Sequence, residues 1–341
     1  MKKYFYLLAM ALFTAQFQSC SSDDDDDTPP VPDLEENTPP VPELEENYLS
    51  IENAVYNAQE FPEATTSETL EGIDMSSQVM TGAMNYISIV TEQEIQKFYI
   101  GVKEVEGYWE YDPTATLTRA TTNYYTYVIP VMISQFYTGN SVIILSGLLI
   151  DGKVTTPVEK EINYIETMPG EIEVKLAFSN SKDVDLHLYT PSEEHIYYAH
   201  RGGSYETEDG EIVTYGLDID SNAGCSLDHV NKENIYLPKE LIENGTYRVV
   251  VDMYSNCDRS IPTNWSVVVR YKGKLITATT GRNPVAGVYP VNAPNRDMTE
   301  VLTFTIDDAP TTRGANMRII PESFKPVPLT DMDIAKMADA E

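Results

Sequence analysis

The stretch DVDLHLY, residues 183–189, places two carboxylates and an imidazole on one face of a predicted strand. Its aliphatic residues alternate with polar or aromatic ones, as in a half-buried strand. The face opposite the aliphatic residues therefore carries Asp183, Asp185, His187 and Tyr189. Neighbouring side chains on such a face lie about 7 Å apart, so the two aspartates repel each other unless a cation or hydrogen-bond donors stabilise them. Calcium, which prefers oxygen ligands, suits this arrangement.

A second acidic segment, DIDSN at residues 218–222, has the D-x-D-x-N spacing of a calcium-binding loop. An EF-hand is excluded because Gly224 falls at the seventh position, His229 stands at the twelfth instead of a glutamate, and no flanking helices are predicted. We therefore predict a calcium site carried by a β-sandwich, with the ligands Asp183, Asp185, Asp218, Asp220 and Asn222.

A metal-free interpretation of the same acids stays open at this point. Asp183 and Asp185 could cap turns or pair with Lys182 or Arg201, as acids at strand ends commonly do. His187 is a poor calcium ligand, so we expect it to hydrogen-bond an aspartate or to pack. Zinc is disfavoured because the chain has no HExxH motif, and because His195 and His200 are five residues apart without a cysteine pair nearby.

Motifs for catalysis are absent from the sequence. It contains no GxSxG, no HExxH and no phosphate-binding GxxxxGK followed by serine or threonine. Two weaker patterns are a Ser/His/Asp site near Ser204 or Ser226, and a Cys225/His229 nucleophile pair in CSLDH. Chance clustering of such residues in loops explains the first pattern more simply. Disulfide pairing of an exported cysteine explains the second. We predict that the protein is not an enzyme, with a secreted hydrolase as the weakest alternative.

The elements that must position these residues are strands. Short alternating runs rich in tyrosine, valine and isoleucine, separated by turns, predict one antiparallel β-sandwich over residues 48–168 and another over residues 169–307. The fold class is therefore all-β, with Ig-like or jelly-roll-like sandwiches, although the Cys-Trp-Cys hallmark of immunoglobulin domains is missing. The 23 tyrosines fit packing on pleated sheets, and a sugar-stacking platform is the alternative.

The second half resembles the YfaP-like family of secreted β-sandwich domains. The resemblance rests on DVDLHLYTPSEEHIYYAHRGG, LDIDSNAGCSLDHVNKENIYLP and NGTYRVVVDMYSNC, within about residues 169–307. The residues that match the family pattern are Asp183, Asp185, His187, Asp218, Asp220, Glu233, Asn234, Ile235, Gly245, Thr246 and Tyr247. The chain also resembles, more loosely, accessory sandwiches of secreted peptidases in which an Asp-x-Asp strand binds calcium. Neither resemblance implies catalysis.

The first residues predict export and a lipid anchor. Residues 1–19 have the two lysines and the apolar centre of a lipoprotein signal peptide, followed by Cys20 as the lipidation site. An ordinary cleaved signal that leaves a free thiol is the alternative. The acidic run and the ten-residue repeat TPPVPDLEEN/TPPVPELEEN make residues 20–47 a disordered, acidic, proline-rich tether. This arrangement resembles surface lipoproteins of the Bacteroidetes.

Two further features complete the predicted organisation. If Cys20 carries lipid, Cys225 and Cys257 remain to form a disulfide in an oxidising compartment. Residues 308–341 are predicted as a linker followed by a short helix over about residues 331–340, because Thr330 and Asp333 resemble a capping box.

The acidic composition narrows the choice of partners. The formal net charge of −31 disfavours nucleic acid and suits divalent cations, although a solvated acidic surface explains much of it. We predict a non-enzymatic outer membrane lipoprotein, exposed on the cell surface, whose sandwiches bind a glycan or protein ligand and which is stabilised by calcium. The alternative is a structural or assembly component of a surface complex.

Overall fold

A computed structural model describes residues 41–113, 118–119, 124–207, 209–309 and 318–320. Across these residues the chain is built of strands in four sheets, with almost no helix, which confirms the predicted all-β class. The short helical elements are η1 (Leu44–Tyr48), η3 (Ala223–Cys225) and η4 (Lys239–Leu241). The predicted signal peptide, Cys20 and the predicted C-terminal helix lie outside the described residues.

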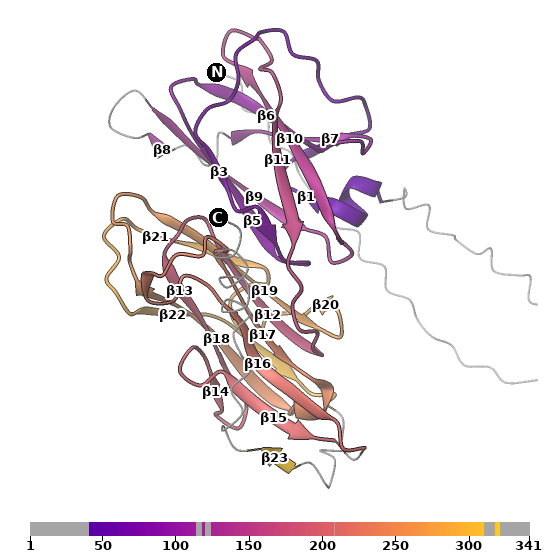
Figure 1. Ribbon diagram of the computed structural model, residues 1–341, viewed down its shortest axis with the longest axis vertical. Coiled ribbons are helices and arrows are strands. Elements are labelled where there is room, and N and C mark those ends of the chain that lie inside the picture. The colour runs from indigo at the N-terminus through magenta and orange to yellow at the C-terminus, as the bar shows by residue number, and fades with distance from the viewer. Residues whose placement is uncertain (1–40, 114–117, 120–123, 208, 310–317, 321–341) are drawn as a thin grey trace, which may run out of the picture. The chain divides into compact units, whose positions relative to one another are not determined.

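The first group of strands, indigo to magenta in Figure 1, forms a five-stranded and a six-stranded sheet. The five-stranded sheet has the order β1-β9-β5-β3, with β8 also paired to β9, and the six-stranded sheet has the order β2-β7-β6-β10-β11-β4. Their bounds are β1 Leu49–Ser50, β2 Val55–Asn57, β3 Ile73–Met75, β4 Gln78–Val79, β5 Met84–Thr91, β6 Ile95–Val102, β7 Tyr108–Tyr111, β8 Thr118–Arg119, β9 Tyr125–Ile133, β10 Asn140–Leu149 and β11 Val158–Tyr164.

These two sheets share one apolar core. Alternate residues of β9, such as Ile129 and Val131, are buried together with Phe98 of β6 and Leu145 of β10, so the sheets pack face to face. Leu44 of η1 is fully buried in the same core. The core therefore includes a residue of the second TPPVPELEEN copy.

The second group forms an eight-stranded and a four-stranded sheet (Figure 1). Their orders are β20-β19-β12-β17-β16-β15-β23, with β21 also paired to β19, and β14-β13-β18-β22. The bounds are β12 Ile172–Phe178, β13 Asp183–Tyr189, β14 His195–Ile196, β15 Gly202–Glu206, β16 Ile212–Asp220, β17 Lys232–Leu237, β18 Gly245–Ser255, β19 Thr263–Tyr271, β20 Lys274–Leu275, β21 Val285–Tyr289, β22 Asp297–Ile306 and β23 Arg318–Ile320.

The core of this second group confirms the alternation predicted for residues 183–189. Val184, Leu186 and Leu188 are fully buried and belong to the cluster that joins the two sheets. Strand β18 pairs with β13 along its length, whereas β14 pairs only with Leu188 and Tyr189. The first five residues of β13 therefore have a strand partner on one side only.

A disulfide joins Cys225 to Cys257, with an S–S distance of 2.01 Å. This confirms the pairing predicted from the cysteine count, and it links the loop after β16 to the end of β18. In the part of the chain that the structure describes, no helix is both long and apolar enough to cross a membrane.

Candidate metal centre

Asp183 and Asp185 are buried, although they lie on the face of β13 opposite its aliphatic residues. The register between β13 and β18 shifts between these two residues, because β18 has one extra residue in that interval. Such a bulge disturbs the ladder and the side chains next to it. The carboxyl groups of Asp183 and Asp185 lie within hydrogen-bonding range of each other. Two buried acids in contact need a proton, a donor or a cation between them.

Three carboxylates converge where the edge of β13 meets the other sheet. Asp185 of β13, Asp220 of β16 and Glu233 of β17 each offer one oxygen, and these oxygens lie within 4.8 Å of one another. Two of the strands belong to the eight-stranded sheet and one to the four-stranded sheet. We call this set the oxygen group.

Each member of the oxygen group has a buried oxygen without a hydrogen-bond partner within the described part of the chain. These atoms are Asp185 Oδ2, Asp220 Oδ1 and Glu233 Oε1. The second oxygens of two of them are held by the protein. Glu233 Oε2 accepts from the backbone N–H of Leu186 at 2.6 Å, and Asp220 Oδ2 pairs with Arg201 at 3.0 Å. Buried carboxylate oxygens are costly to leave unpaired, and a group of this composition can hold a metal ion.

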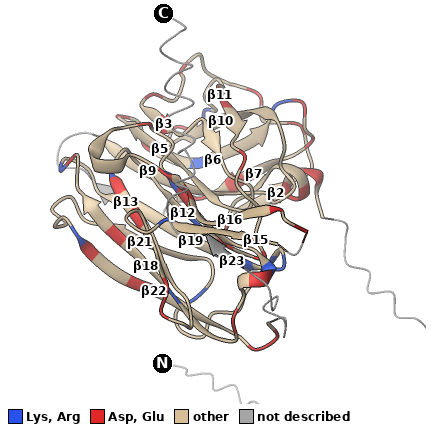
Figure 2. Cartoon of the chain, turned by 60° about the horizontal axis from the view of Figure 1, so that its bottom comes forward, with Lys and Arg blue, Asp and Glu red and all other residues tan. Residues whose placement is uncertain are grey.

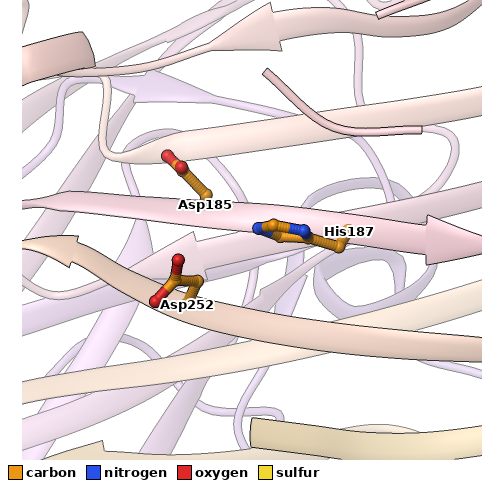
Figure 3. Close-up of side chains that lie close together, drawn as sticks. All are labelled: Asp185, His187 and Asp252. Carbon is orange, nitrogen blue, oxygen red and sulfur yellow. The ribbon is translucent and has the colours of Figure 1, made fainter. Parts of the chain in front are cut away.

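A second set also contains Asp185. One atom each from Asp185, His187 and Asp252 lie within 4.8 Å of one another. Asp252 lies on β18 directly opposite Asp185 in the strand register. Figure 3 shows the far nitrogen of the His187 ring pointing toward the two aspartates. We call this set the nitrogen group; it shares Asp185 with the oxygen group and no other residue.

Positive charge near these acids is sparse. Acidic residues outnumber basic ones along the chain, as Figure 2 shows. Among the described residues, Arg201 forms a salt bridge with Asp220, and no lysine or arginine forms one with Asp183, Asp185, Glu233 or Asp252. Lys182, an alternative partner from the sequence, instead donates to the Ile261 carbonyl. The charge of Arg296 opposes, but does not cancel, the rise that burial causes in the pKa of Asp252.

Burial dominates the ionisation of these groups. It raises the pKa of Asp183 to about 6 and that of Asp252 to about 6. It also raises the pKa of Asp185 and of Glu233 well above their ordinary values, and neighbouring carboxylates add to the rise. Without a cation, the centre therefore holds protons that ordinary carboxyl groups release.

Three predicted ligands, Asp183, Asp218 and Asn222, lie in neither group. Asp218 accepts hydrogen bonds from the Met168 N–H at 2.7 Å and from the Asn234 side chain at 2.6 Å. Asn222 holds the following loop together, because its side-chain oxygen accepts from the N–H groups of Asp228 and His229. Both side chains are thus engaged in protein hydrogen bonds.

Asp183 lies beside the oxygen group and contacts the loop closed by the disulfide. Its Oδ2 accepts the N–H of Gly224 at 2.9 Å. Cys225 follows and is bonded to Cys257, so it is not a free thiol and the Cys225/His229 nucleophile pair is excluded. His229 instead contacts the Ser181 hydroxyl through Nδ1 at 2.7 Å.

His187 is held by a second histidine inside an aromatic stack. Its Nδ1 lies 2.8 Å from His195 Nε2. The His195 ring stacks on Tyr189 and on Tyr197, each at a centroid distance of 4.0 Å. Arg248 covers the other face of Tyr189 at 4.4 Å. The stacked rings and Arg248 cover one another's faces, so the stack is not a flat platform for a sugar ring.

Comparisons with known proteins leave the family undetermined. No family model matches the chain, and no curated protein matches it. The YfaP-like resemblance therefore stays a prediction.

Solved structures give two weak likenesses. SGBP-B of the Bacteroides ovatus mixed-linkage glucan utilization locus, solved with a mixed-linkage heptasaccharide, is 14% identical with a TM-score of 0.21, over 56% of this chain and 40% of that one. Dimeric latent PorU from Porphyromonas gingivalis is 10% identical with a TM-score of 0.22, over 71% of this chain and 20% of that one. The matches thus span less than half of either solved chain, and TM-scores this low carry no argument about fold or ligand.

Proposed function

We propose that this chain is a non-enzymatic, lipid-anchored surface protein that binds an extracellular glycan or protein, and that calcium holds its second sandwich in the binding form. The observation that carries the calcium part is the oxygen group, in which three buried carboxylate oxygens converge without a partner among the described residues. Surface anchoring rests on the sequence pattern around Cys20.

Calcium fits the oxygen group because the group offers only hard ligands. Calcium takes six to eight oxygens in a flexible geometry, so backbone carbonyls or water would complete the shell around Asp185, Asp220 and Glu233. Magnesium fits less well, since it demands a near-ideal octahedron and loses water reluctantly. The second oxygens of Asp220 and Glu233 are fixed by protein donors, and such contacts orient metal ligands.

A cation at this position would tie the two sheets together. Asp185 comes from the four-stranded sheet, whereas Asp220 and Glu233 come from the eight-stranded sheet. Asp220 also precedes the loop whose Gly224 is bound by Asp183. Because loops at the ends of sandwiches commonly carry binding sites, calcium would order a binding surface as well as stabilise the core.

The calcium part is tested by thermal melting of the full chain after metal removal. Calcium at about 100 times its Kd should stabilise the fold by roughly 2.7 kcal/mol, which raises Tm by several degrees. Glu233→Gln should abolish the rise. Glu211→Gln, which changes an exposed acid in the turn just before β16, should keep it. If melting curves of the unaltered chain with calcium and with chelator superimpose, the site is withdrawn.

The ligand part is tested by a glycan array probed with the calcium-loaded chain and by crosslinking on intact cells. Binding to a defined glycan or to a released extracellular protein supports a ligand-binding function. If crosslinking instead recovers the same envelope subunits in a fixed ratio, and the array gives no signal, the chain is an assembly component.

A further inference from the structure

We propose that the nitrogen group is a second cation site, which binds a borderline divalent ion of the zinc class between Asp185, His187 and Asp252. It goes beyond the calcium site and depends on it only through the shared Asp185. Zinc binds imidazole nitrogen and carboxylate oxygen, whereas calcium prefers oxygen alone.

The ligand atoms are buried and unpaired. Asp185, His187 and Asp252 are exposed by only 2%, 3% and 3%. Asp185 Oδ2, His187 Nε2 and Asp252 Oδ1 have no hydrogen-bond partner among the described residues. A buried imidazole N–H that faces two carboxylates ordinarily donates a hydrogen bond to one of them. His187 Nε2 has no such partner among the described residues, which points to a bound ion.

His195 fixes the tautomer that metal binding requires. His187 can present a lone pair at Nε2 only if its proton is on Nδ1, and Nδ1 lies 2.8 Å from His195 Nε2. In that arrangement the Nδ1–H of His187 donates a hydrogen bond to the unprotonated Nε2 of His195. Metal-bound histidines usually donate their second N–H in this way.

The aromatic stack holds His195 in place. Tyr189 and Tyr197 lie on opposite faces of its ring, with interplanar angles of 12° and 7°. His187 also stacks beside Tyr197 at 5.2 Å. Packing therefore fixes the orientation of both imidazoles, and His195 acts as a positioning residue for the metal ligand His187.

The centre carries more negative charge than one divalent ion balances. Asp183, Asp185, Asp220, Glu233 and Asp252 carry a formal charge of −5 when ionised, and Arg201 and Arg296 add +2. One calcium ion would leave −1 of the remaining −3 uncompensated in a buried site. A carboxylate shared by two ions, as Asp185 would be, is a common arrangement in two-metal centres.

The experiment titrates the metal-free full chain with Zn²⁺ by calorimetry in saturating calcium. We expect one Zn²⁺ per chain. His187→Gln and Asp252→Asn should weaken binding by more than about 100-fold, and His195→Ala by roughly 10- to 100-fold. His195→Gln should recover part of the loss, because its amide oxygen can accept the same hydrogen bond. His229→Gln, which changes an exposed histidine outside the centre, should leave the affinity unchanged.

Nitrogen-15 NMR of histidine-labelled chain reports the ligand directly. Zn²⁺ should shift one imidazole Nε2 resonance, and this resonance should be absent in His187→Gln. The proposal is overturned if binding survives both His187→Gln and Asp252→Asn, which would indicate exposed histidines. It is also overturned if Zn²⁺ and calcium displace each other with a total of one ion per chain. If calcium fails to stabilise the chain but zinc binding still depends on His187, only the calcium site is rejected.

Discussion

Removal of metal should make the stability of the second sandwich fall as pH rises. Burial raises the pKa of Asp183 from 3.8 to about 6 in the folded chain. Between these values the folded state keeps a proton that the unfolded chain releases. Unfolding then releases protons, so the free energy of unfolding is highest below about pH 4 and is progressively lost as pH rises through 6.

The predicted loss of unfolding free energy is large compared with the total stability of a domain. A pKa rise from 3.8 to about 6 for Asp183 corresponds to about 3 kcal/mol of unfolding free energy. Asp252, whose pKa burial also raises to about 6, contributes a loss of the same order. Asp185 and Glu233 extend the fall to higher pH, because their pKa values are raised further. Typical domains have only about 5–15 kcal/mol in total.

Bound cations should reverse this dependence. Metal binding requires ionised carboxylates, so protons compete with the metal at low pH and cease to compete as pH rises. The difference in Tm between metal-loaded and metal-free chain should therefore be small near pH 4.5 and largest near pH 8. Asp183→Asn and Asp252→Asn should each flatten the metal-free curve, because each removes one group that titrates.

The assay is urea unfolding at pH 4.5, 6 and 8, with chain dialysed against chelator and then returned to metal-free or calcium buffer. Far-ultraviolet circular dichroism reports the sheets. Tryptophan fluorescence, measured in a Trp109→Phe background because Trp109 lies in the first core, reports Trp265 in the second core. A metal-free curve that stays level or rises between pH 4.5 and 8 would refute the reasoning, because the acids would then be stabilised by groups other than a cation or a proton.

Three further predictions follow from the anchor, the disulfide and the ligand set. Cys20→Ser should move the chain from the membrane to the soluble fraction, measured by detergent partitioning, and unchanged partitioning would exclude the lipid anchor. Reduction of Cys225–Cys257, which closes a loop with a sequence separation of 32, should lower the unfolding free energy by about 4 kcal/mol in urea titrations; equal stability with and without reductant would contradict this. Magnesium should raise the Tm less than calcium does at equal concentration, and an equal rise would reject the all-oxygen calcium assignment.

The sequence predicts those features that depend on a local residue pattern or on residue counts. Alternation placed Val184 and Leu186 in the core, and the cysteine count paired Cys225 with Cys257. Glu233 was visible only as a residue of the family resemblance. Asp252 carried no signal, since it joins Asp185 through the register between β13 and β18, which is set by contacts far apart in the chain.

A bulge explains why Asp218 and Asp220 separate despite their calcium-loop spacing. The register of β16 against β17 shifts between Leu217 and Ile219, so that Leu217 lies opposite Ile235 and Asp220 lies opposite Glu233. One extra residue in the strand reverses the alternation after it. Asp218 is that residue and faces Asn234, whereas Asp220 lies on the same side as Glu233. Spacing predicts a shared face only in a regular strand.

The buried charge lies where the strand ladders are interrupted. Register shifts occur between Asp183 and Asp185 in the pairing of β13 with β18, and between Leu217 and Ile219 in the pairing of β16 with β17. At the edge of β13 that lacks a strand partner, Glu233 accepts the Leu186 N–H. A continuous ladder there would satisfy that N–H with a backbone carbonyl. The opening in the ladder thus supplies both the space and the orienting contacts that a cation centre requires.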